Sequence, residues 1–215
     1  MPDSTARHDS FASLYDLGML GDWFYRPARR QAVNQLHVKG HETVFDFFCG
    51  TGLNFPLLLK KLGPGGKIIG VDGSQKMLRE AGNKIEGLEE RVELLQSDFT
   101  TPSGIRRTVN AIRRLDAHRF LFTLGLTCLP NWQQFFDAIF DAAPTGSRFS
   151  IMDVYNESLS LGVRLMNWVA YSDTRRPVWE GLEDRGADFQ FDRKPFRLLG
   201  SLLDVSVVTA SGRKP

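Results

Sequence analysis

The chain has 215 residues, of which 42% are apolar, and its formal net charge is only +2. This length and apolar content are ample for one hydrophobic core, so we expect a single domain over 1–215. The small charge and the scattered basic residues argue against a nucleic-acid partner, which calls for a concentrated basic face. Nothing resembles a secretory leader or an apolar span of about 20 residues, and the two cysteines lie in apolar segments. We therefore expect a cytoplasmic protein with free thiols.

Strands and helices alternate after an N-terminal helical segment. Pro27 predicts the start of a helix that runs to about His37. Apolar runs between turn residues predict strands over 44–48, 67–71, 91–95, 117–124, 148–154, 187–191 and 203–210. Helical periodicity predicts helices over 54–62, from Ser74 onward, over 103–115, around 132–140, and near 158–171 and 176–185. This alternation predicts an α/β fold with a mostly parallel, seven-stranded sheet and helices on both faces.

The segment 44–55, VFDFFCGTGLNF, joins a buried strand to a helix through a glycine turn. Gly50 and Gly52 lack side chains, so the backbone can turn sharply and stay open to a ligand at the helix start. Twenty residues after Gly52, Asp72 ends the second strand, where a carboxylate can accept hydrogen bonds from the hydroxyls of an adenosine ribose. Phe55 replaces the third glycine of a dinucleotide fingerprint, and its bulk favours a cofactor without a pyrophosphate.

These features resemble the class I S-adenosylmethionine-dependent methyltransferases, whose first motif is hh-Asp/Glu-h-Gly/Ala-Cys-Gly-Thr-Gly and whose second strand ends in an acid. The order of elements resembles that family from about Leu36 to the C-terminus. The resemblance implies a Rossmann-like fold, S-adenosylmethionine as the cofactor, and no metal site. The cofactor-binding residues that it implies are Tyr15, Asp46, Gly50, Thr51, Gly52, Asn54, Asp72, Gly73, Met77, Asp98, Phe99, Thr123 and Leu124.

The adenine side of the cofactor is expected after the third strand. In the resembled family, the acid at the position of Asp98 binds the adenine amino group, and the backbone amide of the next residue, Phe99 here, meets a ring nitrogen. The ring of Phe99 or the side chain of Met77 would cover the adenine. The alternative for Asp98 is that it only starts the turn into 100–102.

Three further residues have competing interpretations. Asp46 lies inside the first strand, where a buried charge needs partners, and it either approaches the cofactor's ammonium group or bonds only to loop amides. Asp72 is favoured at the ribose over a capping role, because Ser74 can cap the following helix. Cys49 has no basic neighbour in the sequence, so a structural role is favoured over a nucleophilic one.

The acceptor side has no comparable signature. A sulfonium methyl group is already electrophilic, so transfer depends mostly on in-line approach, with proton removal when needed. The candidate catalytic residues are Tyr15, Asp153 and Tyr155, and the candidate substrate-binding residues are Tyr25, Arg175 and Arg176. The two arginines would serve as phosphate partners. For these side chains a purely structural role is the alternative.

Residues 1–40 combine aromatic and apolar side chains with arginines. In the resembled family, residues before the first strand often fold over the cofactor, and an aromatic residue of a Tyr-Asp pair touches it. Tyr15-Asp16 matches that pair, so 1–40 is expected to form a helical lid on a core of 41–215. The same surface could instead rest on an anionic membrane or pack against the sheet edge.

Three stretches, GTGLNFPLL, LGLTCLPNW and SDTRRPVWE, narrow the resemblance to phospholipid or betaine-lipid N-methyltransferases and related quinone C-methyltransferases. This resemblance implies methyl transfer to a small molecule or a lipid head group, with N-methylation favoured. Quinone-type C-methylation and small-molecule O-methylation are alternatives. A noncatalytic cofactor-binding scaffold is an alternative of another class, because a fold does not by itself establish a reaction.

Overall fold

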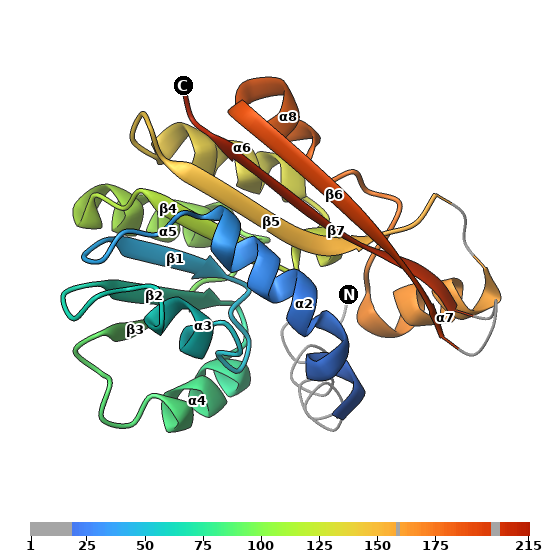
Figure 1. Ribbon diagram of the computed structural model, residues 1–215, viewed down its shortest axis with the longest axis horizontal. Helices are drawn as coiled ribbons and strands as arrows, with labels where there is room; N and C mark the ends of the chain where they lie inside the picture. Colours follow the sequence, from blue (N-terminus) through green and yellow to red (C-terminus); the bar gives the residue numbers. More distant parts are fainter. Residues whose placement is uncertain (1–18, 158–159, 199–202) are drawn as a thin grey trace.

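The computed structural model describes residues 19–157, 160–198 and 203–215 (Figure 1). Within these residues, seven strands form one sheet in the order β3-β2-β1-β4-β5-β7-β6. Strands β1 to β5 pair in parallel, whereas β7 runs antiparallel to both of its neighbours. The strands are β1 Thr43–Phe47, β2 Lys67–Asp72, β3 Val92–Gln96, β4 Arg119–Thr123, β5 Arg148–Tyr155, β6 Ala187–Leu198 and β7 Leu203–Arg213.

Helices cover both faces of the sheet, which confirms the predicted α/β architecture (Figure 1). One face packs against α2, α3 and α4, and the other against α5, α6 and α8. The helices are α2 Met19–Gln35, α3 Phe55–Leu59, α4 Gln75–Lys84, α5 Pro102–Leu115, α6 Trp132–Ala142, α7 Leu161–Ala170 and α8 Glu180–Arg185, with a 3₁₀ turn, η1, at Leu126–Cys128.

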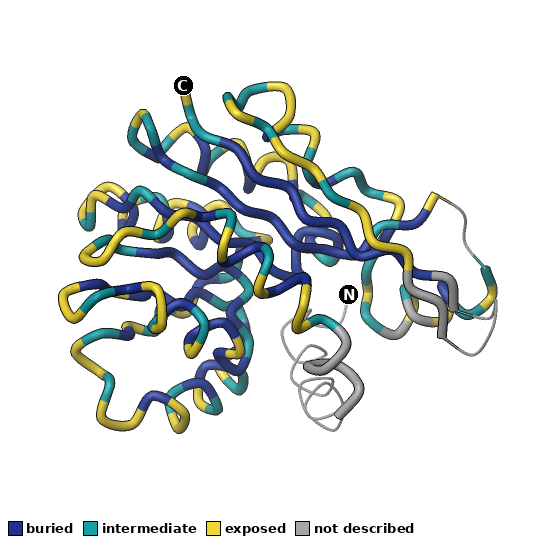
Figure 2. Tube along the Cα trace, in the orientation of Figure 1, coloured by how far each residue is buried: buried dark blue, intermediate teal, exposed yellow. Residues whose placement is uncertain are grey.

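The core is rich in phenylalanine, and the central strands are buried along their length (Figure 2). Side chains alternate along β1, so Phe45 and Phe47 face α5 and α6. Phe47 stacks on Phe122 of β4 at 4.6 Å and meets the ring of Phe135 edge-on at 5.6 Å. The same alternation turns Asp46 toward the α2 and α3 face, where it is fully buried.

The predicted start of the first helix is wrong. Pro27 lies inside α2, which already begins at Met19. A proline in a helix removes one backbone hydrogen bond and normally favours a break. Here Pro27 is exposed, while its neighbours Ala28 and Ala32 are buried against the sheet. Packing of the inward side of α2 therefore outweighs the local preference of proline.

The boundaries of three other elements differ from the prediction because of contacts distant in sequence. Helix α3 ends at Leu59 instead of 62, and the guanidinium of Arg91 donates to the carbonyls of Leu62, Gly63 and Gly66 in the turns that follow. Strands β6 and β7 extend beyond the predicted 187–191 and 203–210, since they pair with each other over their whole length. Pro195 fits in β6 because β6 is the edge strand.

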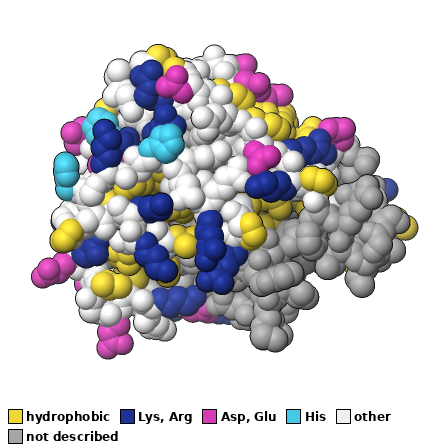
Figure 3. All heavy atoms as spheres, viewed as in Figure 1, with side chains coloured by type: hydrophobic (Ala, Val, Ile, Leu, Met, Phe, Trp, Pro, Cys, Tyr) yellow, Lys and Arg dark blue, Asp and Glu magenta, His cyan; other side chains and the backbone are white. Residues whose placement is uncertain are grey.

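The surface of the described residues is mixed in character. On the face shown in Figure 3, Lys and Arg side chains are scattered among other residues and do not form one continuous field. Exposed apolar side chains include Leu161, Leu165 and Trp168 of α7. Within the described ranges, no helix has the length and apolar character needed to cross a bilayer.

The packing of α5 can be tested at Gly104, with Gly82 of α4 as the control. A Cβ on Gly104 would overlap the backbone carbonyl oxygen of Asp98, whereas a Cβ on Gly82 of α4 would make an ordinary contact, 3.8 Å from Leu94 Cδ1. We expect Gly104→Ala to lower the free energy of unfolding by about 1–3 kcal/mol. We expect Gly82→Ala to raise it by up to about 1 kcal/mol through helix propensity. Urea unfolding measures both, and equal stabilities would contradict the close approach at Gly104.

Candidate functional site

The site lies where the carboxyl ends of the parallel strands meet, the edge at which sheets of this kind bind ligands. The loop after β1 turns sharply there, with positive φ angles of 56° at Phe48, 54° at Gly50 and 79° at Gly52. A Cβ built on Gly50 would meet nothing within 4 Å. The loop therefore borders open space at Gly50, as predicted, but not at Gly52, where a Cβ would overlap the ring of Phe55.

Asp72 joins this loop to the end of β2. Its Oδ2 accepts a hydrogen bond from the backbone N–H of Gly50 and its Oδ1 one from Ser74, both at 2.9 Å. The carboxylate is half-buried, and a carboxylate oxygen can accept more than one hydrogen bond. The Ser74 hydroxyl accepts from the Met77 amide, which confirms Ser74 as the cap of α4. Gly73 and Met77 are half-buried beside Asp72.

Asp98 forms the turn that the alternative interpretation predicted. Its Oδ1 accepts from the backbone N–H of Thr100 at 2.9 Å and from the Thr100 hydroxyl at 2.6 Å. The ring of Phe99 does not face the site edge, since it is 4% exposed and packs 5.0 Å from Phe48 and 4.5 Å from Phe135. The structure thus leaves the backbone amide of Phe99 for the expected cofactor contact.

A buried polar network lies beneath the glycine loop. The Nη1 of Arg29 on α2 donates to Asn54 Oδ1 at 2.8 Å, and Asn54 Nδ2 donates to Asp46 Oδ1 at 2.7 Å and to Thr123 Oγ1 at 3.0 Å. Burial raises the pKa of Asp46 to about 7, while the bond from Asn54 and the charge of Arg29 act in the opposite direction. Asp46 Oδ2 is buried with no hydrogen-bond partner among the described residues. The network brings Asp46, Asn54 and Thr123 together with Arg29, and the bond that Asp46 accepts comes from the Asn54 side chain and not from a loop amide.

Two side-chain contacts hold the glycine loop from outside the network. Lys84 at the end of α4 donates to the hydroxyl of buried Thr51 at 2.9 Å. The ring of Phe48 lies against Gly125, where a Cβ would overlap it. Leu124, next to Gly125, is half-buried with a φ of 54°. Neither Lys84 nor Phe48 was predicted at the site, because their partners lie more than a full element away in the sequence.

The structure does not support the argument that the bulk of Phe55 disfavours a pyrophosphate over the helix start. Phe55 is 2% exposed, and its ring lies beneath the loop, 2.6 Å from where a Cβ on Gly52 or Gly70 would be. The ring therefore occupies space that two glycines provide inside the protein. Its bulk cannot discriminate between cofactors with and without a pyrophosphate.

The predicted acceptor-side residues have structural partners, with Tyr15 lying outside the described residues. Asp153 is 1% exposed, and its Oδ1 accepts from the Thr127 hydroxyl at 2.7 Å and its Oδ2 from the Thr127 amide at 3.2 Å. Burial raises the pKa of Asp153 and raises that of Tyr25 to about 12. Tyr155 meets Trp179 edge-on at 4.8 Å. These contacts agree with the structural alternative for Asp153 and Tyr155.

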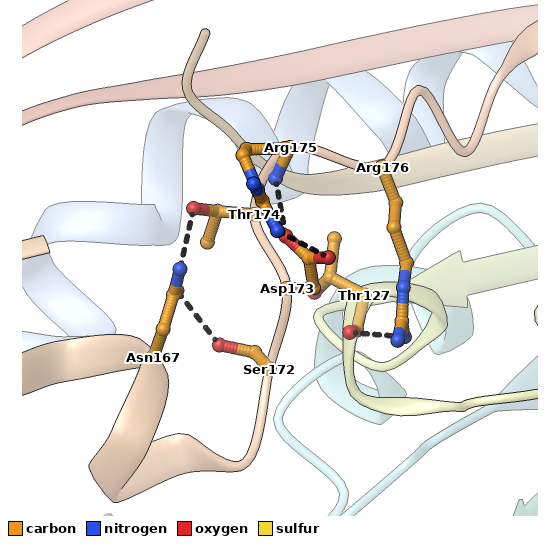
Figure 4. Close-up of polar contacts among 7 residues, drawn as sticks. All are labelled: Thr127, Asn167, Ser172, Asp173, Thr174, Arg175 and Arg176. Carbon is orange, nitrogen blue, oxygen red and sulfur yellow. Dashed lines mark hydrogen bonds and ion pairs between the residues drawn. The ribbon is translucent and has the colours of Figure 1, made fainter. Parts of the chain in front are cut away.

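The two arginines expected at a phosphate are bonded within the protein (Figure 4). Arg176 Nη1 donates to the carbonyls of Thr127 and Leu129 at 2.8 and 2.9 Å. Arg175 pairs with Asp173 at 3.0 Å. Phosphate binding by Arg175 would therefore have to compete with Asp173. Further bonds among Asn167, Ser172 and Thr174 hold the same segment against α7.

Both cysteines have properties of structural thiols. Burial raises the pKa of Cys49 well above its usual value and raises that of Cys128 to about 12. A thiol is nucleophilic only as its thiolate, so neither group is activated.

The sheet order and a family match identify the domain. Residues 44–143, which contain the glycine loop, Asp72 and Asp98, match the family described as "Methyltransferase domain". The reversed β7 between β5 and β6 also differs from the 3-2-1-4-5-6 order of dinucleotide-binding sheets. The chain carries a class I S-adenosylmethionine-dependent methyltransferase domain.

Similar proteins match this chain over different lengths. A demethylmenaquinone methyltransferase of Lactobacillus johnsonii is 37% identical over 93 residues, which are 42% of this chain and 36% of that protein. Phosphoethanolamine N-methyltransferase 2 of Haemonchus contortus has a similar structure, with a TM-score of 0.70 and 12% identity, over 96% of this chain and 57% of that one. The [4+2]-cyclase SpnF has a TM-score of 0.62 and 14% identity, over 88% and 81%. The structural likenesses show the fold alone.

The residues of the methyltransferase domain fit S-adenosylmethionine on three observations. Open space lies above Gly50, and the carboxylate of Asp72 is held beside it. Asp46 also has a buried carboxylate oxygen without a described hydrogen-bond partner next to the loop. A glycine turn with carboxylates beside it suits a cofactor that carries a ribose and a cationic amino-acid moiety.

Asp46 should make stability depend on pH. Its pKa is about 7 in the folded protein, whereas an ordinary aspartate has a pKa of 3.8. Between these pH values the folded state binds more protons than the unfolded state, so the free energy of unfolding falls as pH rises. We expect Asp46→Asn, whose Oδ1 can still accept from Asn54, to remove roughly 2–3 kcal/mol of the stability difference between pH 5 and pH 8. Urea unfolding at the two pH values measures it, and an unchanged difference would contradict the assigned pKa.

Gly50 should be required for the ligand and not for the fold. Gly50 and Gly146 both have left-handed φ angles, 54° and 82°, with open space at the Cβ position, but Gly146 lies before β5 at the opposite edge. Each alanine variant should lose about 1 kcal/mol of stability. Calorimetric titration with S-adenosylhomocysteine should show an affinity loss of more than about tenfold for Gly50→Ala alone. Equal affinities for the two variants would remove Gly50 from the site.

Proposed function

We propose that the protein transfers the methyl group of S-adenosylmethionine to a small molecule or a lipid head group, with nitrogen as the favoured acceptor atom. The observation that supports the proposal is the hydrogen bond between the Gly50 amide and the Asp72 carboxylate, which holds the carboxylate proposed to bind the ribose beside the open glycine loop. When bound, the cofactor supplies a methyl group that its sulfonium makes electrophilic. The protein then has to orient the acceptor and exclude water.

The titratable groups support nitrogen over carbon or oxygen. An amine attacks with its lone pair and can release its proton afterward, whereas a phenol or an enol needs a base beforehand. Among the described residues, His37, His41 and His118 precede β1 or β4 and therefore lie at the opposite edge of the sheet. At the site edge, Asp153 is bonded to Thr127, and burial raises the pKa of Tyr25 to about 12. Neither Asp153 nor Tyr25 is therefore placed as a ready base.

The structural neighbour named phosphoethanolamine N-methyltransferase also supports an amine acceptor, since the likeness covers 96% of this chain. The relative named demethylmenaquinone methyltransferase supports the quinone-type alternative. The neighbour named as a cyclase keeps a reaction other than methyl transfer open, because the fold does not determine the chemistry.

Asp72→Ala should weaken binding of S-adenosylmethionine by roughly 1–3 kcal/mol, the range for a lost charge-assisted hydrogen bond, without unfolding the protein. Asp184→Ala, at an exposed position on α8, is the control and should bind as the wild type does. Calorimetric titration with S-adenosylmethionine, S-adenosylhomocysteine and NAD measures both effects. Unchanged affinity in Asp72→Ala would refute the ribose role, and binding of NAD alone would refute the proposed function.

The acceptor is tested by transfer of a radiolabelled methyl group to phosphoethanolamine, amine-bearing phospholipid vesicles and a demethylated quinol. The proposal expects label in one of the amines. Transfer only to the quinol would overturn the nitrogen preference. Cofactor binding without transfer to any of the three would favour the scaffold alternative.

A further inference from the structure

Arg29 is a buried cation on the inward side of α2. It is 6% exposed, and its neighbours Ala28 and Ala32 are buried against the sheet. A guanidinium at such a position is costly unless it is hydrogen-bonded. Its Nη1 donates to Asn54 Oδ1, the side chain that immediately precedes α3. The helix thus brings a positive charge to the end of the glycine loop.

The amide of Asn54 links Arg29 to two strands of the sheet. Because the amide oxygen accepts from Arg29, the amide nitrogen is directed toward acceptors, and it donates to Asp46 on β1 and to Thr123 at the end of β4. A flipped amide would place its N–H groups against the guanidinium and its oxygen against the carboxylate. Arg29 therefore determines how Asn54 holds both partners.

We propose that Arg29 is a positioning residue of the cofactor site, which acts through Asn54 to hold Asp46 and the glycine loop in their binding geometry. The inference rests on the proposed function and deepens it, since cofactor affinity then depends on the docking of α2. The effect of Arg29 can be measured at Asp46, whose second carboxylate oxygen has no hydrogen-bond partner in the described structure.

The charges around Asp46 make this coupling measurable. Arg29 from α2 favours the ionised carboxylate, whereas burial and the charge of Asp72 at the end of β2 oppose it. Cys49, which follows β1, also faces Asp46, but burial keeps its thiol neutral. Removal of the Arg29 charge should therefore raise the pKa of Asp46 further.

The first test needs no cofactor. The carboxyl carbon of Asp46 is titrated by NMR in the wild type, in Arg29→Met and in Arg30→Met, where Arg30 is the exposed neighbour on the same helix. We expect the midpoint to rise by about one pH unit or more in Arg29→Met and to stay unchanged in Arg30→Met. Equal midpoints in all three proteins would overturn the proposal. Arg29→Gln, which keeps an N–H donor without the charge, gives the same comparison if the methionine variant does not fold.

The second test measures the affinity for S-adenosylmethionine as a function of pH. Arg29→Met should bind at least about tenfold more weakly near pH 7 and recover part of the loss at higher pH. Arg29→Lys should retain more affinity than Arg29→Met. In the double variant, Arg29→Met should add no pH dependence beyond that of Asp46→Asn alone. A loss that is uniform across pH would assign Arg29 to folding alone and overturn the proposal. If the wild type does not bind S-adenosylmethionine, the proposed function is refuted. The NMR titration of Asp46 without cofactor would still show whether Arg29 acts on Asp46.

Discussion

An acid in the interior of a central strand organises the site of this protein. Asp46 is fully buried in β1, and burial raises its pKa to about 7. Such a group is tolerated only with hydrogen-bonding partners nearby. Asn54, just before α3, donates to Asp46, and the same amide bonds to Thr123 at the end of β4 and to Arg29 in the middle of α2. The need to compensate one buried carboxylate thus joins these three elements beneath the glycine loop.

Packing beneath the loop imposes a second constraint. The ring of Phe55 occupies the space left by the absent side chains of Gly52 and Gly70, so it holds the loop close to β2. Asp72 at the end of that strand then reaches the Gly50 amide. The glycines of the motif therefore serve two purposes, since Gly50 borders the ligand side and Gly52 accommodates a buried aromatic ring.

The cofactor half and the acceptor half of the domain are built differently. The family match over 44–143 contains the polar groups assigned to the cofactor. On the acceptor side, the candidates Asp153 and Arg176 instead stabilise η1, through the amide and hydroxyl of Thr127 and the carbonyls of Thr127 and Leu129. These contacts hold η1 in place and agree with a structural role for both side chains.

The sequence by itself determined the order of strands and helices, the glycine loop, the acid at the end of β2 and the Ser74 cap. These features depend on hydrophobic periodicity and on backbone preferences within a few residues, which are local properties. Only the tertiary structure decided that Pro27 lies within α2, that Phe55 points into the core and that Arg29 reaches Asn54. It also showed that Arg176 bonds to η1, 47 and 49 residues away. The direction of a side chain and the identity of its partner depend on how distant elements pack, and local sequence patterns carry no record of that packing.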